Sequence, residues 1–234
     1  GVQTCALPIS ITEPKHLIGK KIGVQGYRYT VNLWLRGLLK EFYGFSPEQA
    51  TWITNEAEGN GYEIPGNIPV ELRPGKSPVE KLRDGDVDAI WLPRVPVEHL
   101  RREPWIRRLF PDAQGEFHKF YQRTGILPFS HTVVMNANLA REKPWIAKRL
   151  YDAFNAAQSL VDECCNVEKM VSYVDSMYLM EAQHAVYGPN PFANGLTAAN
   201  RRVMNMFVRY AREQGYISRE LSIEELFFEA TLRL

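Results

Sequence analysis

The chain has 234 residues, 45% of them hydrophobic and 12% aromatic, so it can bury a sizeable core in one large or two small domains. Its 28 basic and 27 acidic residues are interspersed, and a net charge of +1 excludes the broad positive field of a nucleic-acid-binding protein. No apolar run approaches the roughly 20 residues of a membrane span, so membrane insertion is not expected. The three cysteines, two of them adjacent, suggest neither a disulfide framework nor a metal cage.

The first nine residues, GVQTCALPI, match the translation of a common short-read sequencing adapter. We therefore expect residues 1–9 to be an artefactual tail, and we exclude them from the predicted fold. The alternative is a native N-terminal tail. If the tail is an artefact, the chain is truncated upstream, and the absence of a signal peptide carries no information.

The stretch from Gly19 to Gly44 predicts a strand, a polar turn and an amphipathic helix. Lys20 to Val24 form the expected strand, Thr30 is the expected N-cap, and Gly44 is the expected C′ residue. The helix has one apolar face, made of Val31, Leu35, Leu38, Leu39 and Phe42. Its opposite face is expected to carry the polar residues Asn32, Arg36, Lys40 and Glu41. A helix start after Tyr27, Arg28 and Tyr29 suits a flat anion; the alternative is an ordinary strand–helix unit with surface side chains.

Further strands and a helix complete an α/β pattern. Strands are expected at Thr51–Thr54, Pro69–Leu72 and Asp88–Leu92. A capping box, Ser77 to Glu80, opens a helix that ends at Asp84 and Gly85. Strands that alternate with helices in this way predict a parallel sheet flanked by helices.

The second half of the chain is mostly helical by pattern, apart from one strand expected at His131–Met135. The expected helices cover Val97–Arg102, Asp112–Gln122, Pro144–Val161, Val167–Val186 and Ala198–Gln214. A last short helix should follow the capping box that begins at Ser222.

Four segments, in order, resemble the 4,5-dihydroxyphthalate decarboxylase family. They are LIGKKIGVQGYRYTVNLWLRGLL, GKSPVEKLRDGDVDAIWLPRVP, RTGILPFSHTVVMNANLAREKPWIAKRLYDAF and GLTAANRRVMNMFVRYAREQGYISRELSIEELF. The resemblance extends from about Ile11 to Leu232. One departure lies after Val24, where this chain has QGYRYT and the family pattern has PEYQMT: Tyr27 and Thr30 carry over, whereas an acidic role at Gly26 does not.

The resemblance implies the α/β fold of type 2 periplasmic-binding-protein-like proteins, with two lobes. Residues 10–128 would form one complete lobe with a parallel or mixed sheet. Residues 129–234 would form the return strand and the helical C-terminal part of the other lobe, whose N-terminal part is missing. The hinge is expected near Pro128 to Thr132, and the apolar faces of the C-terminal helices are expected to be exposed.

Candidate site residues lie where strands end and helices begin, because parallel sheets bind ligands outside the carboxyl ends of their strands. In the complete lobe, residues 10–128, the predicted substrate-binding residues on the loops are Tyr27, Arg28, Thr30, Lys76, Ser77 and Arg94. Arg123, Thr124 and His131 bracket the return crossing, and Arg123 and Thr124 are also predicted to bind the substrate. Arg94 follows a buried-looking strand and its planar guanidinium suits a carboxylate; the alternative is a solvent-exposed loop arginine. His131 could titrate near neutrality in a cleft, and a structural histidine is the alternative.

The family resemblance implies a non-oxidative decarboxylase that acts on a hydroxylated aromatic carboxylate. Arg28, Arg94 and the helix start at Thr30 would hold carboxylates, and His131 or Tyr27 would supply the proton. No organic cofactor is expected. No metal site is expected either, since the histidines lack ligand spacing.

The competing interpretation is a substrate-binding protein that delivers an aromatic or heteroaromatic carboxylate to a membrane ABC transporter. The fold serves both purposes. The enzyme would be cytoplasmic and the binding protein periplasmic, and either could form an oligomer.

Overall fold

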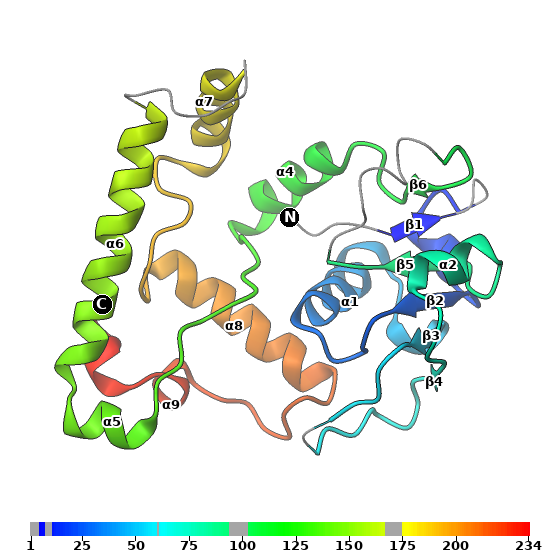
Figure 1. The fold of residues 1–234 in the computed structure, drawn as a ribbon, viewed down its shortest axis with the longest axis horizontal. Coiled ribbons are helices and arrows are strands. Elements are labelled where there is room, and N and C mark those ends of the chain that lie inside the picture. Colours follow the sequence, from blue (N-terminus) through cyan, green and yellow to red (C-terminus); the bar gives the residue numbers. More distant parts are fainter. Residues whose placement is uncertain (1–4, 8–10, 60, 94–102, 167–174) are drawn as a thin grey trace. The chain divides into compact units, whose positions relative to one another are not determined.

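The structure is a computed structural model that describes residues 5–7, 11–59, 61–93, 103–166 and 175–234 (Figure 1). The chain divides into two compact units. The first unit combines Gly1–Glu116 with Arg209–Glu220, and the second combines Phe117–Val208 with Leu221–Leu234. The lobe boundary between residues 128 and 129 stays a prediction, because these units are defined by compactness alone. The helix predicted at Val97–Arg102 lies outside the described residues.

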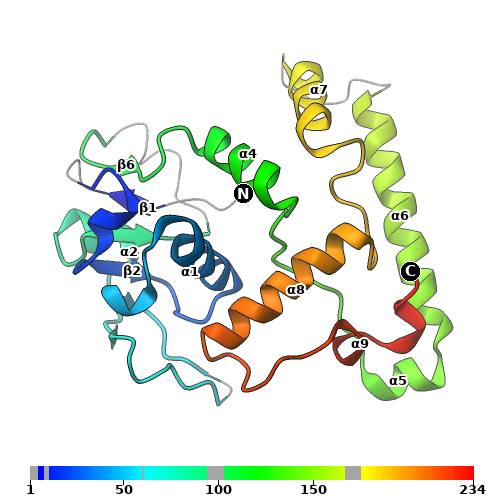
Figure 2. The same cartoon turned by 180° about the vertical axis from the view of Figure 1, so that it is seen from behind.

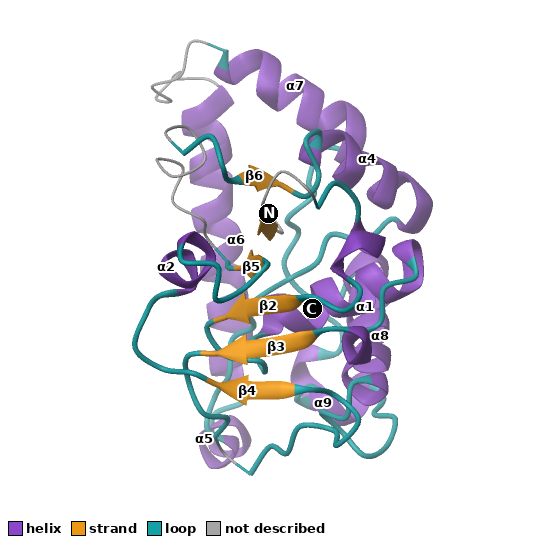
Figure 3. Ribbon diagram, turned by 90° about the vertical axis from the view of Figure 1, so that its right-hand side faces the viewer, coloured by secondary structure: helices purple, strands orange, loops and turns teal. Residues whose placement is uncertain are grey.

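A six-stranded sheet organises the first unit. Its strand order is β4-β3-β2-β5-β1-β6. The four strands β2 (Lys21–Val24), β3 (Thr51–Thr54), β4 (Val70–Leu72) and β5 (Ala89–Trp91) run parallel, and Figure 3 shows β2, β3 and β4 pointing the same way. The short strand β1 (Cys5–Leu7) pairs antiparallel with β5, and β6 (Arg107–Arg108) pairs antiparallel with β1 at the edge of the sheet.

The sheet has a helix on each face, as the alternation of side chains along its strands requires. On one face, Ile22, Val24 and Trp52 pack with α1 (Thr30–Tyr43). On the other face, Ile53 and Ile90 pack with α2 (Pro78–Arg83). The predicted α/β class with a parallel sheet and helical layers is therefore confirmed. Short 3-10 turns at Pro14–Leu17 (η1) and Pro47–Gln49 (η2) precede β2 and β3.

Helix α1 follows the predicted bounds but is more deeply buried than its pattern indicated. Gly44 ends it in the left-handed conformation at φ 66°, as expected of a glycine. Its N-cap is Tyr29, without a side-chain cap bond, so the prediction of Thr30 as N-cap is wrong. Asn32 and Arg36, expected on an exposed polar face, are buried. The physical reason is that both side chains find hydrogen-bond partners inside the unit.

The N-terminal residues contribute to the sheet. Cys5 and Ala6 pair with Trp91 and Ile90 of β5, although residues 1–9 were excluded from the predicted fold. Backbone hydrogen bonding explains the pairing, because any extended segment can add to an open sheet edge. The origin of the tail is a separate question that strand pairing does not test.

The second unit is helical in the described residues. Its helices are α4 (Ala113–Thr124), α5 (Ala137–Glu142), α6 (Trp145–Asn166), α7 (Ser176–Tyr187), α8 (Ala198–Glu213) and α9 (Ile223–Leu226), followed by the 3-10 turn η3 (Glu229–Thr231). The first residues of α4 and the last of α8 belong to the first unit. The C-terminus lies beside α6 (Figures 1 and 2). Among the described helices, none has the length and apolar character needed to span a bilayer.

The strand predicted at His131–Met135 is not formed, because residues 125–136 are neither helix nor strand. A strand needs a neighbouring backbone to pair with, and the described part of the second unit offers no strand. The β-branched residues of this segment are consequently exposed, with Val134 at 86%. The prediction was made from a local apolar pattern that no partner completes.

Candidate functional site

The carboxyl ends of the four parallel strands gather four loops at one edge of the sheet, described at residues 25–29, 55–59, 73–77 and 92–93. This edge is where α/β sheets of this kind bind ligands. The structure describes the contacts of the first three loops. Arg94, the expected carboxylate ligand on the fourth loop, lies outside the described residues.

The turn between β2 and α1 is fixed by its neighbours. The Tyr27 N–H donates to Glu58 Oε1 at 2.7 Å, and the Gln25 carbonyl accepts from the N–H groups of Asn55 and Glu56 at 3.0 and 3.1 Å. From α1, Asn32 Nδ2 donates to the Gly26 carbonyl at 2.6 Å. Contacts from two sides give the turn a defined shape, which a binding site requires.

Arg28 is half-buried and its Nη1 donates to the Gly59 carbonyl at 2.8 Å. Because a carbonyl is uncharged, this contact does not neutralise the positive charge of the guanidinium. Arg28 therefore keeps its capacity to attract a carboxylate at this edge.

Glu56 is a candidate site residue that was not predicted from the sequence. Its carboxylate accepts from Gln25 Nε2 and from the Tyr29 hydroxyl, the latter at 2.8 Å. These hydrogen bonds from Gln25 and Tyr29 hold the pKa of the Glu56 carboxyl below its ordinary value, and the same bond to Glu56 raises the pKa of Tyr29. The only signal in the sequence was its position two residues after β3. The edge thus presents an ionised acceptor beside the helix start.

Tyr27 lies in the core. Its ring is 0% exposed, stands edge-on to Trp52 at 5.7 Å between centroids, and carries the Arg36 guanidinium 3.8 Å from its centroid. Burial raises the pKa of its phenol to about 12. The side chain therefore does not reach solvent at the edge of the sheet, so the expected role as proton donor stays a prediction, and in this structure only the Tyr27 backbone shapes the turn.

The N-terminus of α1 retains donors for an anion. The N–H groups of Asn32 and Leu33 turn back to the Tyr29 carbonyl, at 2.8 and 3.1 Å. The candidate donors are consequently the N–H groups of Thr30 and Val31, which point outward from the first turn. The helix start at Thr30, which the sequence predicted to hold a carboxylate, thus retains these two N–H groups as candidate donors.

Lys76 and Ser77 are engaged in local structure. Lys76 Nζ lies 2.6 Å from Asp84 and 2.9 Å from Asp86, and these two carboxylates raise its pKa. Ser77 caps α2 in the predicted capping box with Glu80. Their proposed ligand contacts would compete with these bonds, so both are weaker candidates than Arg28.

Lys81 was not predicted, yet it is buried at this edge. Its Nζ donates to the Asn55 side chain and to the Arg73 carbonyl, so it ties together the loops after β3 and β4. Desolvation lowers its pKa. This role was not predicted, because the helical spacing of Lys81 with Val79 and Leu82 on α2 does not distinguish it from an ordinary helix residue.

The remaining predicted residues belong to the second unit. Arg123 is exposed near the end of α4, and the Thr124 hydroxyl donates to the Phe120 carbonyl at 2.8 Å. His131 is exposed in the irregular segment after α4. Their predicted binding and catalytic roles stay predictions.

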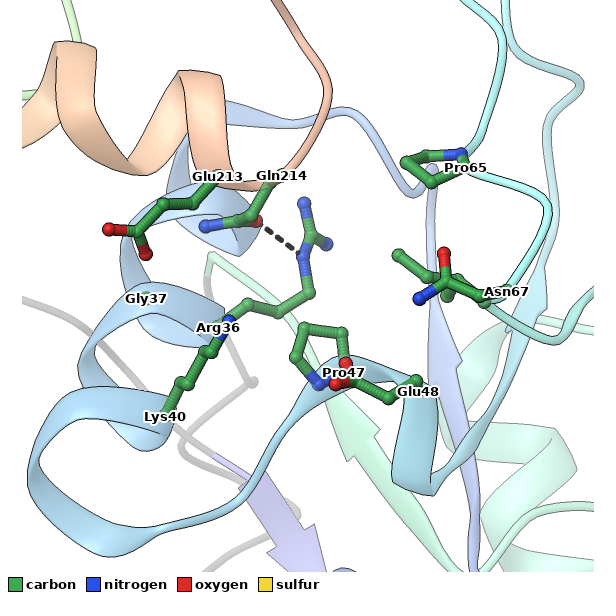
Figure 4. A pocket seen from close by; sticks show the side chains of 10 residues that line it. Arg36, Gly37, Lys40, Pro47, Glu48, Pro65, Asn67, Glu213 and Gln214 are labelled. Atoms are coloured by element: carbon green, nitrogen blue, oxygen red, sulfur yellow. Dashed lines mark hydrogen bonds between the residues drawn. The ribbon is translucent and has the colours of Figure 1, made fainter.

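A cavity of about 90 Å³ lies in the first unit beside Arg36 (Figure 4). Its walls include Lys40, Glu48, Asn67, Glu213 and Gln214. Ligand pockets usually measure about 300–1,000 Å³, so this cavity is too small for an aromatic dicarboxylate. Among the residues that the structure describes, no group of three or more histidines, cysteines or acids is arranged to hold a metal ion.

The architecture is that of the type 2 periplasmic-binding-protein-like fold. The chain superposes on the periplasmic aliphatic sulphonate binding protein SsuA from Escherichia coli with a TM-score of 0.51 at 13% identity, covering 100% of this chain and 71% of that one. It superposes on the alkanesulfonate-binding protein SsuA from Xanthomonas axonopodis pv. citri with a TM-score of 0.50 at 14% identity, covering 95% and 68%. At these identities the likeness concerns the fold alone.

In sequence, the chain is similar to 4,5-dihydroxyphthalate decarboxylases, and the predicted resemblance is confirmed. It is 27% identical to the protein of that name from Comamonas testosteroni over 238 residues, which cover 95% of this chain and 70% of the relative. It is 31% identical to the one from Pseudomonas putida over 113 residues, covering 45% and 44%. No protein-family model matches the chain.

Proposed function

We propose that this protein is a lyase that removes carbon dioxide from a hydroxylated aromatic carboxylate, with 4,5-dihydroxyphthalate as the first substrate to test. The observation that carries the proposal is the similarity to a 4,5-dihydroxyphthalate decarboxylase along 95% of the chain. The structure supports it with a polar edge of a parallel sheet at which a cation, helix N–H groups and an ionised carboxylate lie together.

The chemistry needs few groups. The ring carbon that bears the carboxylate gains a proton, the bond from that carbon to the carboxylate breaks, and its electron pair stays on the ring as carbon dioxide leaves. A neighbouring carboxylate must be held, for which Arg28, Arg94 and the N–H groups at Thr30 are the proposed donors. Glu56 would accept a hydrogen bond from a ring hydroxyl, which pushes electron density toward the carbon that is protonated.

The proton donor is assigned to His131 in this proposal. Tyr27 is the weaker candidate because its hydroxyl is buried and its pKa is raised to about 12. Replacing His131 with Gln should abolish most turnover while leaving substrate affinity within a few fold, whereas Tyr27→Phe should act mainly on stability.

The test is release of carbon dioxide from 4,5-dihydroxyphthalate by the full natural protein, without an added organic cofactor. Arg94→Ala should lower the rate about 100-fold or more, since one oriented charge contributes a few kcal/mol to the barrier. Arg94→Lys should restore only part of the rate, because an ammonium lacks the bidentate geometry. Lys20→Ala is the matched control, as Lys20 precedes β2 at the other end of the strand.

The second candidate function is ligand delivery to a membrane transporter. It is favoured by the structural neighbours, which are sulphonate-binding proteins. Tight binding of hydroxylated aromatic acids without turnover would support this function and contradict the enzyme. Location gives an independent check, since we propose a cytoplasmic enzyme, while the transporter component would be found in the periplasm.

A further inference from the structure

Residues 209–220 comprise the end of α8 and the residues that follow it, and they belong to the first unit, where they dock on α1; we call them the return segment. Tyr210 packs edge-on against Trp34 at 5.9 Å between centroids and donates its hydroxyl to Glu41 at 2.6 Å. Gln214 Nε2 donates to the Leu33 carbonyl at 2.9 Å. Through Tyr210 and Gln214, these contacts hold the segment on α1.

Arg36 connects the return segment to the turn between β2 and α1. Its side chain is fully buried, and its Nε donates to Gln214 Oε1 at 2.9 Å (Figure 4). Its Nη2 donates to the Tyr216 hydroxyl at 2.6 Å, and its Nη1 donates to the Tyr27 carbonyl at 2.9 Å. One planar guanidinium therefore bridges two residues of the return segment and the backbone of the turn.

Tyr216 completes a closed arrangement of hydrogen bonds. Its hydroxyl accepts from Arg36 and donates to the same Tyr27 carbonyl at 3.4 Å. Tyr62 stacks on the Tyr216 ring at 4.7 Å between centroids, which fixes the ring in place. Burial raises the pKa of the Tyr216 phenol, so it remains a donor at neutral pH.

The Tyr27 carbonyl belongs to the turn that carries Arg28 and leads into the N-terminus of α1. Both of its acceptor positions are used by Arg36 and Tyr216, so the peptide plane has little freedom to rotate. The next peptide groups along the chain position the Arg28 side chain and the outward N–H groups of Thr30 and Val31. We propose that Tyr216 and Arg36 are positioning residues for the anion-binding edge of the sheet, acting through the Tyr27 carbonyl.

Gln214 and Tyr216, in the last tenth of the chain, are consequently required for the geometry of a site formed near residue 27. The consequence for ligand affinity rests on the proposed function of that edge. The consequence for the backbone of the turn does not, because hydrogen exchange of the turn can be measured without a ligand.

The test compares two matched variants of the full chain, Tyr216→Phe and Tyr210→Phe. Each removes one hydroxyl from the return segment, but only the first hydroxyl contacts Arg36 and the turn. Tyr216→Phe should speed amide hydrogen exchange across residues 26–33 by about tenfold, the loss expected for one hydrogen bond of ordinary strength. Tyr210→Phe should speed exchange of that peptide by no more than its loss of overall stability, measured by urea unfolding, accounts for.

Equal exchange in the two variants, or unchanged exchange in Tyr216→Phe, would overturn the proposal. Arg36→Lys is the second variant, and it should also speed exchange of the turn, because the three N–H donors of an ammonium share one nitrogen and cannot reach the acceptors that three guanidinium nitrogens contact. The dissociation constant of 4,5-dihydroxyphthalate is then measured, and it should rise in Tyr216→Phe and not in Tyr210→Phe. Failure of the unaltered protein to bind this acid would contradict the proposed function, while the exchange comparison would still decide whether Tyr216 positions the turn.

Discussion

The two units of the chain differ in where their large apolar side chains lie. In the first unit, both hydrophobic clusters of the described residues pack against the sheet, and Trp34, Trp52 and Trp91 are fully buried. In the second unit, Trp145, Phe154 and Leu160 on α6 are exposed, with Trp145 at 62%. A sheet buries the side chains on its two faces against helices, whereas helices without a sheet can bury their apolar faces only against one another. The difference shows that an apolar stripe on a helix predicts burial only where a second layer is present.

Polar and aromatic contacts stabilise the second unit in place of a large core. Tyr187 of α7 lies against Tyr121 and His118 of α4, at 4.7 and 5.6 Å between ring centroids. Arg201 donates to Glu224 and to the Leu232 carbonyl, which ties α8 to the C-terminal residues. Such contacts contribute little each when they are exposed. We therefore expect the second unit to be the less stable of the two.

The largest expected effect comes from replacing one tryptophan in each of these two environments with alanine. Trp52→Ala should lower the free energy of unfolding of the first unit by about 3–5 kcal/mol, because it removes a fully buried ring and its hydrogen bond to the Pro47 carbonyl. Trp145→Ala should change stability by no more than about 0.5 kcal/mol, since the ring is mostly in solvent. Urea unfolding followed by circular dichroism measures both. A large loss in Trp145→Ala would show that the second unit has a core after all.

A smaller effect is expected where the return segment crosses α1. A Cβ atom at Gly37 would overlap the Tyr210 ring, so Gly37→Ala must displace this ring and its hydrogen bond to Glu41. The expected cost is about 1–3 kcal/mol, typical of overpacking. Gly66→Ala is the matched control, since a Cβ there meets open space. If Gly37→Ala proves as stable as the control in thermal unfolding, the packing of Tyr210 on α1 is looser than described.

The same capping motif occurs in both units, which gives a third comparison. Ser77 caps α2, whose Val79 and Leu82 belong to a hydrophobic cluster, while Ser222 caps the four-residue α9. Ser77→Ala should cost about 1 kcal/mol in urea unfolding, the usual value for an N-cap. Ser222→Ala should cost less, because fraying of α9 exposes only Ile223. An equal loss in both variants would indicate that α9 is coupled to more of its unit than its contacts suggest.

The sequence was sufficient for elements whose signals are local. Strand β3 has the predicted bounds, and α1 ends at Gly44 as predicted, because alternation and a left-handed glycine are properties of a few neighbouring residues. The burial of Arg36 could not be foreseen, since its partners Gln214 and Tyr216 are 178 and 180 residues away in sequence. A charged residue at a helical surface position is ordinarily exposed, and only the tertiary fold supplies the three acceptors that make burial favourable.

The candidate site was predicted in part for the same reason. The rule that ligands bind at the carboxyl ends of parallel strands directed the prediction to the edge of the sheet that carries the turn with Arg28. Glu56 was missed because its relation to Tyr29 depends on the parallel pairing of β2 and β3, which places their following loops side by side. The burial of the Tyr27 ring could not be foreseen, because an aromatic residue in a polar turn gives no sign of which way its ring points.

The smallest effect concerns the acid sensitivity of this edge. Hydrogen bonds from Gln25 and Tyr29 lower the pKa of Glu56 from its ordinary value of 4.5, so the folded state favours the ionised carboxylate. A lowered pKa in the folded state contributes stability above pH 4.5, and this contribution is lost as the pH falls through the folded pKa. Glu56→Gln removes the titrating group. The stability of the unaltered protein should therefore exceed that of Glu56→Gln near neutral pH, and the two should converge in acid.

The measurement is the thermal midpoint of both proteins across the acidic range at low ionic strength. The shift should be modest, because Glu56 is exposed and its hydrogen bonds compete with water. Tyr29→Phe is the matched control: it removes one of the two donors and should retain part of the pH-dependent difference, since the Gln25 amide still favours the carboxylate. A difference between unaltered protein and Glu56→Gln that stays constant with pH would mean that Glu56 stabilises the edge by packing and not as an ionised acceptor, and the proposed hydrogen bond to a substrate hydroxyl would lose its electrostatic basis.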